Sequence, residues 1–263
     1  MREIIRKVPI PTAGVALGLA ALGNLLQPYT EIVHIVCGIL SLVLIAMLGA
    51  KIALFPDMIR DDLHNSIMAS VSATLFMTLM QLAGYLAPFA YIPAFALWSA
   101  AVVAHLALMG WFTARFISHF KLHEVFPTYF ICYVGIVVAS VTSPTFGMEA
   151  VGHLLFWFGF ACYVVLLGLV TYRYMKHEIP ESARPLFCIY TAPMSLSLVG
   201  YLATAPQPNL VFVLAMLVLA QVLFAVVLSR LPVLLRLRFY PSYAAMTFPF
   251  VITATALGKA LAF

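Results

Sequence analysis

Nine apolar stretches, separated by short polar or proline- and glycine-containing breaks, make up most of the chain. They lie near residues 11–28, 31–55, 64–87, 91–116, 127–144, 149–174, 185–204, 208–230 and 241–262. Each holds 18 to 26 residues, and a helix needs about 20 apolar residues to cross the hydrocarbon core of a bilayer. We therefore predict an all-α integral membrane protein with nine spans, forming a single domain over residues 1–263.

Composition excludes a water-soluble fold, because 64% of the residues are hydrophobic and only 9% are charged. The N-terminal residues 1–14 carry basic side chains but no small-residue cleavage pattern, so they do not match a removed signal peptide. Cys37, Cys132, Cys162 and Cys188 all fall in apolar stretches and are expected to be free thiols. We expect a lipid bilayer as the surroundings and no nucleic-acid partner.

Basic residues collect on one side of the predicted bundle. Thirteen of the fourteen Lys and Arg residues lie in the N-terminal segment or next to the loops that follow even-numbered spans, and the exception is Lys259. By the positive-inside rule, this side and the N-terminus are cytoplasmic. The sequence thus predicts a multi-pass protein of the inner (plasma) membrane.

The odd-numbered spans begin with similar segments, at residues 11–14, 64–70, 127–133, 184–190 and 241–247, which predicts repeated helical hairpins. The fifth hairpin lacks its second helix. Odd spans contain 18 Ser and Thr residues and even spans contain 5, so we expect the odd helices to surround a central pore and the even ones to face lipid. The alternative is that these hydroxyls join helices or bond their own backbone carbonyls.

Two prolines, Pro193 and Pro249, lie inside odd spans, where a missing N–H and a ring clash predict a kink. Such kinks widen a bundle at mid-depth, although each one alone fits a packing role equally well. The candidate residues for kinking or lining the pore are Pro193, Pro249, Thr191, Ser195, Thr247 and Thr253.

Charge placement favours anions as the permeating species. All nine acidic residues lie in loops or at helix ends, so no carboxylate relay or cation ring is expected. The odd helices all begin on the basic side, which gathers their partly positive N-termini there. Within spans, Lys259 is a candidate pore charge or a side chain that extends to the interface. His105 is a candidate titrating group or a neutral histidine bonded to a neighbouring helix.

Patterns for catalysis and metal binding are poor. Glu31 with His34 and Glu149 with His153 have helical spacing, but each pair sits in the first turn of an even span, where an acid suits the helix dipole. Gly14 and Gly18 form a G-x-x-x-G motif typical of close helix packing. We expect no metal, no cofactor and no enzyme activity; a membrane enzyme or tellurite-modifying protein is the remote alternative.

Three stretches carry a family resemblance: PIPTAGVALGLAALG at the first span, RPLFCIYTAPMSLSLVGY at the seventh, and TFPFVITATALGK at the ninth. They resemble the tellurite-resistance/dicarboxylate transporter family, which includes the bacterial tellurite-resistance anion channel and plant slow anion channels. The resemblance runs from about Pro9 to Ala262.

The resemblance implies ten helices in five hairpins, a homotrimer, and a pore gated by a phenylalanine that matches Phe248. Against that pattern, this chain shows no tenth helix. The expected function is an anion channel or a transporter of permeant anions. A proton-coupled transporter of dicarboxylates such as malate, in which His105 would titrate, is the alternative.

Overall fold

The computed structural model describes residues 2–263, and this part of the chain is all helical. Seven of its helices are long and apolar enough to cross a membrane. The spans expected at residues 11–28 and 127–144 contain shorter helices, Thr12–Leu26 and Val137–Phe146. The elements in chain order are α1 (Arg2–Arg6), α2 (Thr12–Leu26), α3 (Glu31–Leu54), α4 (Pro56–Asp62), α5 (Ser66–Val71), α6 (Ala73–Leu86), α7 (Tyr91–Phe112), η1 (Thr113–Ile117), η2 (Leu122–Glu124), α8 (Thr128–Tyr133), α9 (Val137–Thr142), η3 (Ser143–Phe146), α10 (Glu149–Lys176), η4 (Glu181–Thr191), α11 (Ala192–Thr204), α12 (Leu210–Leu234), η5 (Pro241–Met246) and α13 (Phe248–Ala262).

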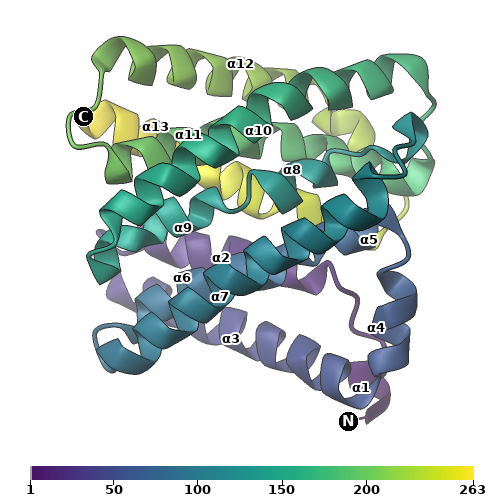
Figure 1. Ribbon diagram of the computed structural model, residues 1–263, viewed down its shortest axis with the longest axis horizontal. Helices are drawn as coiled ribbons and strands as arrows, with labels where there is room; N and C mark the ends of the chain where they lie inside the picture. Colours follow the sequence, from purple (N-terminus) through teal and green to yellow (C-terminus); the bar gives the residue numbers. More distant parts are fainter. Residues whose placement is uncertain (1) are drawn as a thin grey trace.

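The even-numbered spans form long outer helices, α3, α7, α10 and α12. Their sequences are rich in Leu, Val and Ala, contain few hydroxyls, and leave many large apolar side chains exposed. Figure 1 shows α3 and α12 along opposite edges of the bundle, with α7 and α10 crossing in front. Exposed apolar surface on this scale suits helices that face lipid tails.

The odd-numbered spans form five inner segments: α2, α5–α6, α8–α9, η4–α11 and η5–α13. Packing runs from α2 to α6, α9, α11 and α13 and returns from α13 to α2, so the segments form a closed ring. Each outer helix covers the junction between two neighbouring inner segments; α3, for example, packs on α2 and α6. No described helix covers the junction of α13 with α2 in this way.

Four of the five inner segments are broken partway along. α6 follows α5 after Ser72, α9 follows α8 after residues 134–136, and α11 and α13 each follow a 3₁₀ segment. Pro193 and Pro249 occupy the first turns of α11 and α13, where a missing N–H costs nothing. The two prolines expected to kink a helix therefore mark the start of a new one.

Hydroxyl side chains bond to backbone carbonyls near these breaks and between neighbouring helices. Thr78 donates to the carbonyls of Thr74 and Ala13, Ser140 donates to the carbonyl of Gly152, and Ser197 donates to that of Pro193. In a bilayer, an unpaired carbonyl has no water to bond. The excess of Ser and Thr in odd spans thus supports the backbone of the ring.

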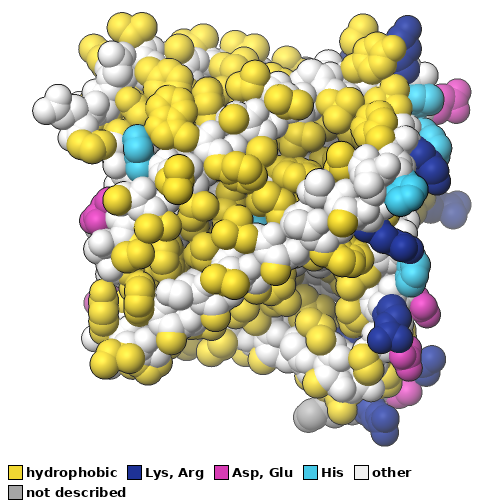
Figure 2. Space-filling view, viewed as in Figure 1, with side chains coloured by type: hydrophobic (Ala, Val, Ile, Leu, Met, Phe, Trp, Pro, Cys, Tyr) yellow, Lys and Arg dark blue, Asp and Glu magenta, His cyan; other side chains and the backbone are white. Residues whose placement is uncertain are grey.

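Charged side chains gather at one end of the bundle, which we call the basic end; it includes Arg6, Arg60, Lys121, Lys176 and Arg236. Figure 2 shows Lys, Arg and His side chains along this edge, next to the N-terminus of Figure 1. The opposite end carries few charged side chains on the face shown. This separation agrees with the loop charges expected from the sequence.

Lys51 ties the N-terminal segment to this end. Its side chain is only 4% exposed, its Nζ donates to the carbonyl of Val8 at 2.7 Å, and it lies 3.8 Å from a carboxylate oxygen of Asp62. A buried ammonium group with one hydrogen bond and one acidic neighbour holds α3, α4 and the chain before α2 together.

We expect Lys51→Met to lower the free energy of unfolding by about 1–3 kcal/mol, because the carbonyl of Val8 loses its buried donor. Thermal unfolding of the purified protein in detergent measures the change. Lys7→Met removes a charge from an exposed site nearby and serves as the control. Equal melting temperatures for the two variants would contradict this role for Lys51.

Candidate functional site

A cavity of about 240 Å³ enters the ring of inner segments from the basic end. All five inner segments contribute to its wall. At its mouth lie exposed or half-buried residues, namely Asn65, Ser182, Tyr240, Pro241 and Ser242. The ring of odd-numbered spans therefore surrounds a space that is open to solvent on the charged side.

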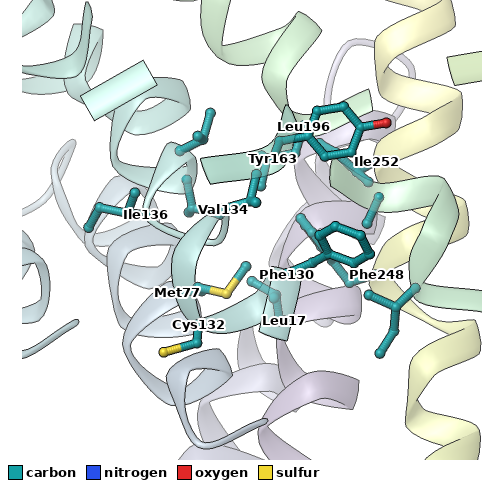
Figure 3. Close-up of a cluster of buried hydrophobic side chains, with 14 of the residues drawn as sticks. Leu17, Met77, Phe130, Cys132, Val134, Ile136, Tyr163, Leu196, Phe248 and Ile252 are labelled. Atoms are coloured by element: carbon teal, nitrogen blue, oxygen red, sulfur yellow. The ribbon is translucent and has the colours of Figure 1, made fainter. Parts of the chain in front are cut away.

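The cavity ends inside the bundle at a layer of bulky apolar side chains. The deepest lining residues of their elements are Leu17 on α2, Met77 on α6 and Leu196 on α11, each no more than 3% exposed. Phe248 of α13 joins them, 6% exposed. Figure 3 shows Phe248 in one cluster with Leu17, Met77 and Leu196. Beyond this layer, side chains such as Ile252 fill the ring.

The wall of the cavity is electrically neutral. None of the described residues that line it is Asp, Glu, Lys, Arg or His. Three of its polar side chains are engaged in hydrogen bonds: Thr74 donates to the carbonyl of Val71, Ser242 to that of Ser182, and Tyr240 to a carboxylate oxygen of Glu181 at 2.9 Å. The bond to Glu181 raises the pKa of the Tyr240 phenol, which stays neutral at physiological pH.

Two helices start at the wall. Ala192 and Pro193 begin α11, Phe248 and Pro249 begin α13, and all four residues line the cavity. At the start of α11 the N–H of Ala192 is bonded to the carbonyl of Ile189, so this helix continues the 3₁₀ segment before it. The backbone does break at Thr247, before α13, and a helix N-terminus carries partial positive charge. The start of α13 therefore places partial positive charge beside the cavity without a basic side chain.

The backbone before Phe248 is held by the G-x-x-x-G motif of α2. Thr247 donates from its hydroxyl to the carbonyl of Gly14 at 3.0 Å. A Cβ atom on Gly18 would lie 2.7 Å from Cβ of Thr247 and 2.9 Å from the backbone nitrogen of Phe248. Glycine at position 18 thus lets the start of α13 approach α2 closely. This contact determines the position of Phe248, the first residue of α13.

The predicted hydroxyl residues lie beside the cavity but are not among those that line it. Ser195 and Thr253 are buried between α11 and α13, with 3.1 Å between their hydroxyl oxygens. Ser195 also donates to the carbonyl of Thr191, and Thr253 donates to that of Pro249. Their bonds join the two helices at the proline breaks, and Pro193 and Pro249 themselves line the cavity.

His105 is completely buried on the outer helix α7. Its Nε2 lies 2.9 Å from the carbonyl oxygen of Cys132, next to the break between α8 and α9. Its ring also approaches Gly135, where an added Cβ would lie 3.2 Å from Cε1, and Gly135 lines the cavity. His105 therefore supports the broken inner segment from behind the wall.

Lys259 is exposed in the last turn of α13 and is not a lining residue. The sequence offered it as a candidate pore charge or as a side chain that extends to the interface.

The apolar layer includes Leu17, Met77 and Leu196, which were not predicted from the sequence. Nothing in the sequence distinguishes these side chains from their apolar neighbours. Their position becomes visible only once the ring and its breaks are known.

The chain matches a known protein family. Residues 7–261 fit the family model SLAC1, described as voltage-dependent anion channel. The match covers nearly the whole chain and confirms the resemblance seen in the three sequence stretches. No curated protein matches this chain.

We expect Gly18→Ala to destabilise the protein, because its methyl group would collide with Thr247 and the backbone of Phe248. Overpacking of this kind costs typically 1–3 kcal/mol. Thermal unfolding in detergent measures it, with Gly258→Ala as the control on α13, where an added Cβ has no neighbour within 4 Å. The two variants melting alike would show that the contact of α2 with α13 is loose.

Proposed function

Since the chain belongs to the family of voltage-dependent anion channels, we propose that it conducts small anions through the ring of five inner segments and that Phe248 is the gate. The observation that carries this proposal is the cavity that all five segments line and that ends at Phe248. The described conformation is then a closed one. Movement of the Phe248 ring would join the cavity to the opposite end of the bundle.

The apolar layer explains how a closed state blocks ions. An ion passing Leu17, Met77 and Phe248 would lose water and gain no polar partner, and narrow hydrophobic constrictions close pores by excluding water. Because Phe248 follows directly after the break at Thr247, its position depends on one short backbone segment. A small rearrangement of that segment is enough to move the ring.

Preference for anions follows from the charges around the pathway. The wall has no acidic side chain, the N-terminus of α13 provides partial positive charge beside the cavity, and the basic end raises the local concentration of anions at the mouth. A wall without basic side chains also binds anions weakly, so that they leave as readily as they enter. We place the basic end in the cytoplasm and expect a homotrimer with one pathway per subunit.

We expect Phe248→Ala to increase the anion current in a planar bilayer roughly tenfold or more, which corresponds to a barrier lower by about 1.4 kcal/mol. Phe250→Ala is the matched control, because Phe250 lies on the same helix but packs against Phe224 of α12, with 6.0 Å between the ring centroids. Similar currents from the parent protein and both variants would exclude Phe248 as the gate.

His105 separates the channel from a proton-coupled dicarboxylate transporter. Its burial and its bond to the carbonyl of Cys132 support a structural role. We expect His105→Gln, which keeps a donor amide and removes the titrating ring, to leave the pH dependence of anion flux between pH 5.5 and 8 unchanged, with roughly the parent's flux. Malate uptake driven by a pH gradient in vesicles, lost in this variant, would favour the transporter instead.

A further inference from the structure

A second cavity, of about 800 Å³, lies at the basic end on the outside of the ring. It is formed by the last turns of α10 and α12 and the start of η4, and it shares no residue with the central cavity. Its volume is in the range of small-molecule binding pockets. Because it lies where two outer helices leave the bilayer, it is accessible from the membrane interface.

Basic side chains dominate this second cavity. Lys176, Arg184 and Arg230 line it, against a single carboxylate, Glu178. Within the described residues, none of these three basic side chains forms an ion pair. Lys176 has only a cation–π contact, with its Nζ 5.8 Å from the ring centroid of Tyr172. Three basic side chains and one carboxylate thus give the cavity an excess of two positive charges.

A further feature favours a bound anion over a solvated patch. His177 also lines the cavity and adds a ring nitrogen that can donate to an anion. Tyr174 lines the cavity as well, but its hydroxyl is buried and cannot be reached from it.

Apolar side chains border the same cavity on the side of the bilayer. Met175 is 77% exposed and Val233 is 60% exposed, and both line it together with Phe187 and Leu234. A soluble anion makes no apolar contacts with such a surface, whereas the acyl chains of a lipid would cover it. Basic pockets between transmembrane helices at the cytoplasmic interface bind lipid phosphate groups.

We propose that this second cavity binds the phosphate headgroup of an anionic phospholipid. Lys176, Arg184 and Arg230 contact the phosphate, His177 donates a hydrogen bond, and the acyl chains lie along Met175 and Val233 between α10 and α12. The headgroup then joins the end of α10, the start of η4 and the end of α12. This site is independent of the central pathway and of Phe248.

The test compares melting temperatures of the full chain, purified and delipidated in detergent, after addition of phosphatidylglycerol, phosphatidylcholine or inorganic phosphate. We expect a larger rise with phosphatidylglycerol than with phosphatidylcholine and no rise with phosphate alone. In the triple variant Lys176→Gln/Arg184→Gln/Arg230→Gln, the two lipids should act alike. The matched control Arg6→Gln/Lys7→Gln/Arg60→Gln removes the same charge from other exposed sites at the basic end and should keep the difference.

Three results would overturn the proposal. Equal stabilisation of the parent by the two lipids would mean that the headgroup charge is not recognised. Loss of the difference in both triple variants would mean that it reflects diffuse charge at the basic end. A full rise with inorganic phosphate alone would indicate a site for a soluble anion and not for a lipid. Native mass spectrometry supplies a second readout, in which one phosphatidylglycerol per chain stays bound to the parent and the control variant only.

Discussion

The requirement that every backbone carbonyl and N–H group inside a bilayer be paired within the protein determines how this chain builds a pathway. A ring of unbroken helices would meet it most simply, but four inner segments are broken. Carbonyls next to the breaks accept bonds from hydroxyls, as that of Thr191 does from Ser195, and from His105 at the carbonyl of Cys132. Side chains support the broken backbone in this way, and the break at Thr247 supplies the bend on which the proposed gate depends.

The breaks also account for a cavity wall that is neutral and mostly apolar. Since hydroxyls are used for backbone pairing, the wall is left to residues such as Leu17, Met77 and Phe248. A closed pore then needs no salt bridge or specific bond to stay closed, because the cost of dehydrating an ion is sufficient. In the proposed function, anion preference comes from the backbone at the start of α13 and from distant charge, both of which act without binding the ion tightly.

Much of this architecture could be predicted from the sequence. Apolar runs and loop charges predicted the basic end and seven of the nine expected spans, because a bilayer leaves few alternatives for such segments; the two at residues 11–28 and 127–144 hold shorter helices. The hydroxyl excess in odd spans identified the inner segments, yet its physical reason differs from a polar lining: Thr253 and Ser195 bond to backbone and to each other. Which apolar side chains close the cavity could not be predicted, since Met77 and Leu196 differ from their neighbours only in where the folded ring places them. Phe248 was identified from family resemblance alone.

We propose that one neutral pathway, closed at Phe248, carries anions. The most direct measurement is the reversal potential of Phe248→Ala in a planar bilayer with a gradient of potassium chloride. We expect reversal close to the equilibrium potential of chloride. Reversal near zero would mean that the opened pathway does not distinguish anions from cations. Reversal close to the equilibrium potential of potassium would mean that it selects cations. Either result would contradict an anion pathway through the ring.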